Sequence, residues 1–298
     1  YLIASSINKY IYTSIIKPFH KGIYLKYSDY EKVEKPLDIK HKIMREILQI
    51  YETKDQYQIE ITTLADVPAG TGLGSSGAFT VSVIKAIQMF YSILSSNELI
   101  AKEACHIEID RLRDSVGKQD QYASAIGGLN EYIFHKDDSV EFNRLSISQL
   151  NLESLEDSLL MFFTGYSRNA SDILENQNNL SLVEDKQMIS NLDSIKEMGL
   201  IAKSLLMKGD INQYGLLMHD HWIQKLKRSP DMCSKKIMDI YNEGINNGAI
   251  GGKLVGAGGG GFLLFVVNDK KQLRSKMLSL GMQELRFEFD NLGVHVLA

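Results

Sequence analysis

One glycine-rich stretch, Pro68–Ala78 (PAGTGLGSSGA), constrains this chain more than any other part of it. A strand-like alternation over Tyr57–Leu64 precedes the stretch, and a helix-like apolar pattern follows it to about residue 91. Its glycines allow a sharp turn and leave backbone amides uncovered by side chains. Ser75 and Ser76 stand where the helix begins, suited to capping it and to offering hydroxyls. Since a helix N-terminus attracts anions, the stretch predicts a phosphate site.

Other nucleotide-binding motifs fit this stretch less well. Gly72–Gly77 satisfies the dinucleotide pattern G-x-G-x-x-G, but that fold needs a second strand with an acidic residue about 20 positions further on. Another helix start, Ser95–Glu98, follows instead. The lysine of an ordinary P-loop is missing after the loop as well. A glycine-rich turn that binds no ligand remains open as an alternative.

Length and composition indicate an ordinary globular protein. The 298 residues suffice for two domains with real cores, and 44% hydrophobic with 23% charged residues is typical. With 33 basic and 37 acidic side chains the net charge is -4, which gives no indication of a nucleic-acid partner. Cys105 and Cys233 lie far apart without metal-ligand spacing, which suits a reducing cytoplasm. No apolar run approaches 18 residues, so we expect no membrane span.

Strand-like and helix-like segments alternate along the chain. The expected strands cover residues 7–15, 22–27, 57–64, 129–135, 159–164, 253–255, 262–267 and 294–297. The expected helices cover residues 39–50, 75–91, 95–113, a short stretch ending at 126, one around 188–205, one opened by Asp210, 231–246 and 269–280. We expect Asp38 to cap the first of these helices. Because residues 137–157 are polar and irregular, we place a domain boundary there, giving domains 1–150 and 151–298.

Taken whole, Pro68–Ala78 resembles the central motif of the GHMP kinases, the small-molecule kinases of galactose, homoserine, mevalonate and phosphomevalonate. Gly117–Tyr122 (GKQDQY) and Lys253–Phe262 (KLVGAGGGGF) resemble two further family features, in the expected order and at the expected distance. The resemblance covers nearly the whole chain, and within the family it is strongest to the kinases of D-glycero-D-manno-heptose 7-phosphate. It implies an α+β, two-domain GHMP kinase fold. The nucleotide-binding N-terminal half would be ribosomal protein S5 domain 2-like, and the C-terminal half ferredoxin-like.

The resemblance also implies which residues bind ATP and carry the chemistry. Asp120 would be the catalytic base or substrate-orienting residue, with Lys118 beside it. From the residues alone, an aspartate that caps the short helix after it explains Asp120 equally well. The residues expected to bind ATP are Pro68, Gly70, Gly72, Leu73, Gly74, Ser75 and Ser76.

Phosphoryl transfer calls for a divalent cation, and Mg²⁺ prefers hard oxygen ligands. Ser76 and Glu108 suit it, with Ser75 as the alternative serine. The resemblance favours a metal role for Glu108, since the family's glutamate precedes its aspartate by the same separation. Without it, Glu108 is equally well a solvated helix carboxylate beside Arg111.

A substrate that carries its own phosphate needs cations at the far end of its site. The residues expected there are Arg168, Lys225, Arg228, Gly258 and Gly259. Considered alone, the basic residues of this set fit a surface role as well.

The implied activity is ATP-dependent phosphorylation of the anomeric C1 hydroxyl of D-glycero-D-manno-heptose 7-phosphate, a step towards nucleotide-activated heptose and surface polysaccharide. A kinase of another sugar, such as galactose or fucose, and a non-catalytic sugar-phosphate sensor are the alternatives. Because Asp120 and Glu108 are both present, an enzyme is favoured. The expected partners are a sugar phosphate and ATP, with no nucleic acid, no membrane and a homodimer as an open alternative.

The chain begins with Tyr1 rather than methionine, inside a strand-like segment. GHMP kinases begin with a short motif, which in the heptose kinases is rich in arginine and glycine. Ser5–Tyr12 resembles the segment that follows that motif. We therefore expect the motif, and with it part of the active site, to lie upstream of this sequence.

Overall fold

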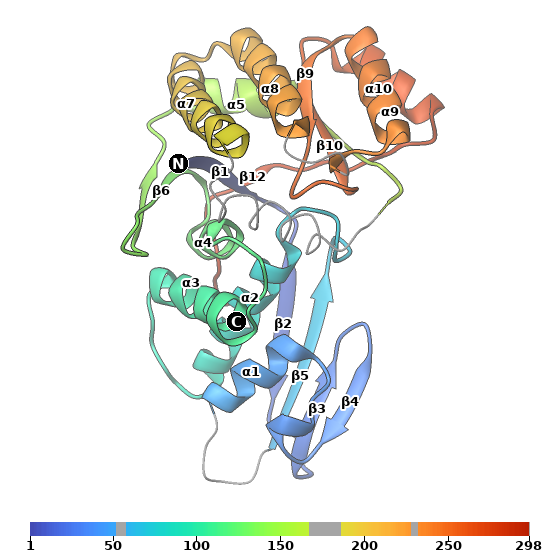
Figure 1. The fold of residues 1–298 in the computed structure, drawn as a ribbon. Helices are drawn as coiled ribbons and strands as arrows, with labels where there is room; N and C mark the ends of the chain where they lie inside the picture. Colours follow the sequence, from blue (N-terminus) through green and yellow to red (C-terminus); the bar gives the residue numbers. More distant parts are fainter. Residues whose placement is uncertain (52–57, 167–185, 228–231, 298) are drawn as a thin grey trace. The chain divides into compact units, whose positions relative to one another are not determined.

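The computed structural model describes residues 1–51, 58–166, 186–227 and 232–297 (Figure 1). The chain divides into two compact units, each built from separate segments. Unit 1 comprises residues 1–5, 69–73 and 129–289, and unit 2 comprises residues 6–68, 74–128 and 290–298. These units do not follow a single cut in the chain, and the boundary near residue 150 stays a prediction.

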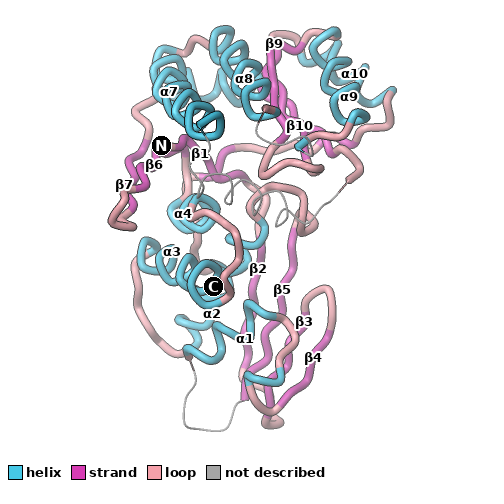
Figure 2. The backbone as a smooth tube through the Cα atoms, in the orientation of Figure 1, coloured by secondary structure: helices cyan, strands magenta, loops and turns pink. Residues whose placement is uncertain are grey.

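Unit 2 contains a four-stranded sheet in the order β2-β5-β3-β4 (Figure 2). Its strands are β2 (Ile11–Ile16), β3 (Gly22–Lys26), β4 (Tyr30–Val33) and β5 (Gln58–Ala65). β5 pairs antiparallel with β2 and parallel with β3. The alternation of β5 buries Ile59 and Ile61, and Ile23 and Leu25 of β3 are fully buried beside them. Helix α2 packs on β2, where the Thr13 and Ser82 hydroxyls are 2.8 Å apart.

The helices of unit 2 begin and end at identifiable residues. They are η1 (Pro36–Asp38), α1 (Lys42–Ile50), α2 (Ser75–Phe90), α3 (Asn97–Cys105), the π-helix η2 (His106–Arg111) and α4 (Gln119–Ile126). The expected cap Asp38 is wrong: it lies in η1, and His41 caps α1 by accepting a hydrogen bond from the Met44 amide. Ser96, one residue after the expected Ser95, caps α3.

Unit 1 is built around two sheets and five described helices. One sheet has the order β12-β1-β6-β7 and the other β11-β8-β10-β9. The strands are β1 (Leu2–Ile7), β6 (Leu129–Phe134), β7 (Val140–Arg144), β8 (Leu159–Phe163), β9 (Ala249–Leu254), β10 (Phe262–Val267), β11 (Gln283–Glu284) and β12 (Phe289–Asp290). The helices are α5 (Gln149–Ser158), α7 (Lys186–Lys208), α8 (Ile211–Leu226), α9 (Lys235–Asn246) and α10 (Lys270–Ser279). A core around Trp222, Tyr241 and Phe265 joins β8 and β10 to α8, α9 and α10.

Three expected segments differ from the structure. Of the expected strand 7–15, residues 11–15 lie in β2, whereas residue 7 ends β1, which belongs to another sheet. Residues 137–157 are not irregular, because they contain β7 and α5, whose Leu155 is buried. The expected strand at 294–297 is absent; there the Val294 amide donates to the Ala125 carbonyl instead. Among the described residues, no helix is both long and apolar enough to cross a membrane.

Candidate active site

The predicted phosphate site lies at the start of helix α2. Gly74 is the N-cap residue, and its φ of +74° is a conformation that strains an L-residue. The Ala78 amide makes the first intrahelical hydrogen bond, to the Gly74 carbonyl. The amides of residues 75–77 therefore have no acceptor within the helix. Ser75 and Ser76 are the first two helical residues and not the cap, so the expected capping role is wrong.

Asp120 packs directly against this helix start. A Cβ added at Gly74 would lie 3.1 Å from Asp120 Cγ, and one added at Gly77 would lie 3.0 Å from Asp120 Cβ. Lys118 is the N-cap residue of α4 and makes no capping hydrogen bond through its side chain. Asp120 lies one residue inside that helix, so its explanation as a cap is wrong. Neighbouring Gln121 is buried, and its Oε1 has no hydrogen-bond partner in the described part of the chain.

Two features of its surroundings disfavour the charged form of Asp120. Burial raises the pKa of Asp120 above its ordinary value, and the nearby charge of Glu108 raises it further. A hydrogen bond from Gln119 acts in the opposite direction. A carboxylate in such a place is a stronger proton acceptor than one in water.

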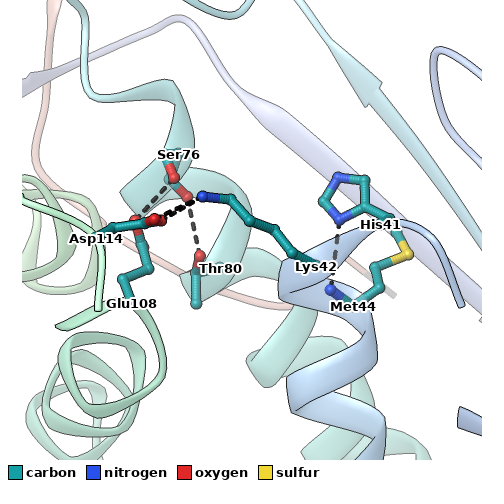
Figure 3. Close-up of polar contacts among 7 residues, drawn as sticks. All are labelled: His41, Lys42, Met44, Ser76, Thr80, Glu108 and Asp114. Atoms are coloured by element: carbon teal, nitrogen blue, oxygen red, sulfur yellow. Dashed lines mark hydrogen bonds and ion pairs between the residues drawn. The ribbon is translucent and has the colours of Figure 1, made fainter. Parts of the chain in front are cut away.

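Ser76 of the same helix start forms a hydrogen-bonded pair with the buried Glu108 (Figure 3). The Ser76 hydroxyl donates to Glu108 Oε2 at 2.7 Å, and Thr80 Oγ1 donates to the Ser76 carbonyl at 3.0 Å. Glu108 is 1% exposed, and its Oε1 has no hydrogen-bond partner among the described residues. Arg111 pairs with Glu46, so the description of Glu108 as a solvated carboxylate beside Arg111 is wrong.

This pair suits a hard divalent cation. A buried carboxylate oxygen without a donor, next to a hydroxyl, is the kind of oxygen pair that Mg²⁺ accepts. In the described parts of the chain no three His, Cys, Asp or Glu side chains cluster as metal ligands. Mg²⁺ commonly completes its shell with water and substrate phosphates, so a two-residue protein contribution fits it.

Two residues that adjoin the pair, Lys42 and Asp114, were not singled out from the sequence. The Lys42 ammonium pairs with Asp114 at 2.6 Å, and the Asp114 amide donates to the Glu108 carbonyl at 3.0 Å (Figure 3). The sequence offers one signal for them. Lys42 and Glu46 are four residues apart and Arg111 and Asp114 are three apart, so each oppositely charged pair can lie on one face of a helix.

In unit 1 the two glycine-rich turns contact each other through their backbones. A Cβ added at Gly72 would lie 2.7 Å from the Val255 carbonyl oxygen, and one at Gly261 would lie 2.0 Å from that of Thr71. Side chains other than hydrogen cannot fit at either position. A Cβ added at Gly256 would lie 2.6 Å from the Gly72 Cα. Pro68 and Gly70 are exposed, whereas Leu73 is partly buried.

The residues expected at the far end of the substrate lie partly in the same unit. Lys225 Nζ donates to the Gly256 carbonyl, and the Gly259 amide donates to the Met232 carbonyl at 2.8 Å. Gly258 is also packed on Met232. Lys225, Gly258 and Gly259 therefore border one turn. Arg168 and Arg228 lie outside the described residues.

Comparison with known proteins agrees with the fold and these motifs. The family model "GHMP kinases N terminal domain" matches residues 40–128, and "GHMP kinases C terminal" matches residues 202–280. A D-glycero-alpha-D-manno-heptose 7-phosphate kinase of Campylobacter jejuni is 31% identical over 91% of this chain and 83% of its own. A bifunctional fucokinase/GDP-fucose pyrophosphorylase of Arabidopsis thaliana is 31% identical over 75% of this chain and 21% of its own.

A solved structure has the same fold as this chain. The crystal structure of a D-glycero-D-manno-heptose 1-phosphate kinase from Bacteroides thetaiotaomicron superimposes with a TM-score of 0.77 at 25% identity. The match covers 100% of this chain and 90% of the other. The expected α+β GHMP kinase fold is thus confirmed. The chain belongs to the GHMP kinases and is a small-molecule kinase of that family.

Proposed function

We propose that this protein transfers the γ-phosphoryl group of ATP to the anomeric C1 hydroxyl of D-glycero-D-manno-heptose 7-phosphate. The product would be the 1,7-bisphosphate, a precursor of nucleotide-activated heptose for surface polysaccharide. Two relatives support the sugar, since one is named a heptose 7-phosphate kinase and the other a heptose 1-phosphate kinase. The proposal places the enzyme in the cytoplasm, where ATP is available and two free cysteines stay reduced.

One observation carries the proposal: Asp120 packs against the first turn of α2, where three backbone amides have no intrahelical acceptor. Amides at a helix N-terminus bind phosphate oxygens, and the helix dipole favours the negative charge. A carboxylate beside them, held in surroundings that raise its pKa, is placed to accept a proton from a sugar hydroxyl. These are the parts that phosphoryl transfer to an alcohol requires.

The roles follow from the chemistry of each group. The amides of residues 75–77 orient the phosphates, while the glycine turn before them, from Pro68 through Gly72 and Leu73, lets the nucleotide approach. Asp120 takes up the hydroxyl proton. The Lys118 ammonium, two residues before it, stabilises the negative charge on the oxygens of the transferred phosphoryl group. Ser76 and Glu108 would hold Mg²⁺, which neutralises charge on the nucleotide phosphates.

The phosphate at C7 would be bound by Lys225 together with Gly258 and Gly259. Lys225 Nζ donates to the Gly256 carbonyl, which holds the ammonium at this glycine turn, and its positive charge favours a phosphate there. Arg168 and Arg228 are proposed to share this role because guanidinium groups bind phosphate through paired hydrogen bonds.

A fucose kinase is the second candidate, favoured by the similarity to the fucokinase. An ATP-consumption assay with heptose 7-phosphate, unphosphorylated heptose, fucose, galactose and mevalonate separates the two. We expect turnover with heptose 7-phosphate, loss of turnover after chelation of divalent metal, and a C1 phosphate in the ³¹P NMR spectrum of the product. Faster turnover of fucose would establish the second candidate. Sugar binding without turnover of any acceptor would indicate a sensor.

A further inference from the structure

The glutamate of the proposed metal site lies in an unusual turn. Helix α3 ends at Cys105, and the π-helix η2 continues the chain through Glu108 to Arg111. The Leu112 amide donates to the Ile107 carbonyl at 3.0 Å, and the Asp114 amide donates to the Glu108 carbonyl at 3.0 Å. These bonds span five and six residues instead of four. Such wide turns are rare and are frequently found at functional sites.

Helix α1 holds this wide turn through two ion pairs, which we call the α1 ladder. In the first, Lys42 Nζ lies 2.7 and 2.6 Å from the two carboxylate oxygens of Asp114 (Figure 3). In the second, Arg111 Nε and Nη2 lie 2.9 and 2.8 Å from Glu46 Oε2. The two residues of α1 carry opposite charges, and so do the two residues that they meet. A shift of the wide turn along α1 would bring like charges together, so the pattern specifies one register.

The α1 ladder is connected to the segment that contains Glu108. Asp114 joins Lys42 through its carboxylate and the Glu108 carbonyl through its amide. Glu108 in turn accepts the Ser76 hydroxyl, so a continuous set of contacts runs from α1 to the first turn of α2. All of these residues belong to unit 2.

We propose that Lys42 and Asp114 are positioning residues that set the orientation of the Glu108 carboxylate for the divalent cation. The proposal rests on the proposed metal role of Ser76 and Glu108. An ordinary exposed ion pair would stabilise the fold slightly and do nothing else. What distinguishes the Lys42–Asp114 pair is the direct backbone link from Asp114 to the Glu108 peptide.

A matched control exists in the same unit. Lys26 pairs with Glu60 at 2.6 Å, with side-chain exposures of 48% and 20% against 54% and 27% for Lys42 and Asp114. That pair joins the neighbouring strands β3 and β5, and neither residue belongs to η2 or to the start of α2. Lys26→Met therefore removes an ion pair of the same length and similar exposure without touching η2.

The test compares Lys42→Met, Asp114→Asn, the exchange Lys42→Asp/Asp114→Lys, and Lys26→Met. Hydrogen exchange of the amides of residues 106–114 is measured on the ligand-free chain. Binding of Mn²⁺ with a non-hydrolysable ATP analogue is measured by electron paramagnetic resonance. We expect the two single variants to exchange faster in this segment and to bind Mn²⁺ about two- to fivefold more weakly, the factor that an exposed ion pair supports. The Michaelis constant for the sugar should stay unchanged, and the exchanged pair should recover most of the loss.

Each outcome decides the proposal. Unchanged exchange at residues 106–114 in Lys42→Met overturns it, and so does an equal loss of Mn²⁺ affinity in Lys26→Met. Faster exchange with unchanged Mn²⁺ affinity overturns it too, because the ladder would then be structural alone. If the wild-type chain phosphorylates no sugar, the proposed function fails, but the exchange and Mn²⁺ measurements still decide the role of Lys42 and Asp114.

Discussion

Two regions of this kinase differ in what their side chains contribute. At the start of α2 in unit 2, buried polar groups such as Glu108 Oε1 and Gln121 Oε1 have no hydrogen-bond partner among the described residues. At the glycine turns of unit 1, Gly72 and Gly261 leave no space for any side chain. The first region therefore contains polar side-chain atoms without hydrogen-bond partners, whereas the second depends on the absence of side-chain atoms.

The difference predicts how each region responds to substitution. An unsatisfied polar group adds little to stability and can even reduce it, because its desolvation is not repaid. A backbone contact without intervening side chains leaves a new Cβ nowhere to go. Changes at the start of α2 should therefore alter rates at constant fold, whereas changes at the glycine turns should alter the fold itself.

Asp120→Asn should give the largest effect and should sharpen this contrast. The change keeps the shape of the side chain and removes the proton acceptor, and general-base assistance is worth about 10² to 10⁴ in rate. We expect kcat to fall by about that factor while ATP and sugar still bind, as measured by steady-state kinetics and calorimetric binding. A kcat within a few-fold of wild type would mean that positioning and charge neutralisation suffice.

Gly261→Ala should show the opposite behaviour. Its new Cβ would lie 2.0 Å from the Thr71 carbonyl oxygen, at a φ of +98°. Gly281→Ala is the matched control, since Gly281 has a φ of +76° with nothing within 4 Å of the added Cβ. We expect about 1 to 2 kcal/mol of destabilisation in the control from φ alone, and about 1 to 3 kcal/mol more in Gly261→Ala. Urea unfolding midpoints measure both, and equal midpoints would contradict the account of the contact.

The features predicted correctly from the sequence are those specified by local patterns. The start of α2 at Ser75 and the strand Phe262–Val267 follow from glycine position and apolar periodicity. Glu108 was singled out differently, through the family resemblance, because the family's glutamate precedes its aspartate by the separation seen here. The choice between Ser76 and Ser75 could not be made from the sequence, and in the structure it is the Ser76 hydroxyl that donates to Glu108.

What the sequence did not show depends on contacts between distant segments. The wide turn η2 is maintained by ion pairs to α1, in which the partners are 65 and 72 residues apart. α5 was missed because its exposed face is polar and only its buried positions, such as Leu155, indicate a helix. The prediction of a terminal strand at 294–297 was wrong. It rested on the apolar residues there, but the Val294 amide forms its hydrogen bond with the Ala125 carbonyl and not with a neighbouring strand. No local pattern carries such information.

Glu108→Gln should have a smaller effect, visible in the pH dependence of kcat/KM. Burial raises the pKa of Asp120, and the Glu108 charge adds to the rise. Because kcat/KM reports ionisations of the free enzyme, removing that charge should move the acid limb of the profile to lower pH. The profile is measured at saturating Mg²⁺, so that weaker metal binding does not enter. A limb that moves to higher pH would show that another group limits the rate.

The smallest effect should be a gain in stability in Asp120→Asn at neutral pH. The pKa of Asp120 is raised in the folded chain, so the charged form costs free energy in the folded state above that pKa. Asparagine carries no such charge, and its melting temperature at pH 7 should exceed that of wild type. As the pH falls through the raised pKa and then below the ordinary value of 3.8, both states bind the proton and the gap should close. Calorimetric scans from pH 7 to about pH 3 measure the gap, and one that widens on acidification would mean that the charged carboxylate stabilises the fold. A closing gap would show that the charge required at the start of α2 is maintained at the expense of stability, as expected where a group serves activity.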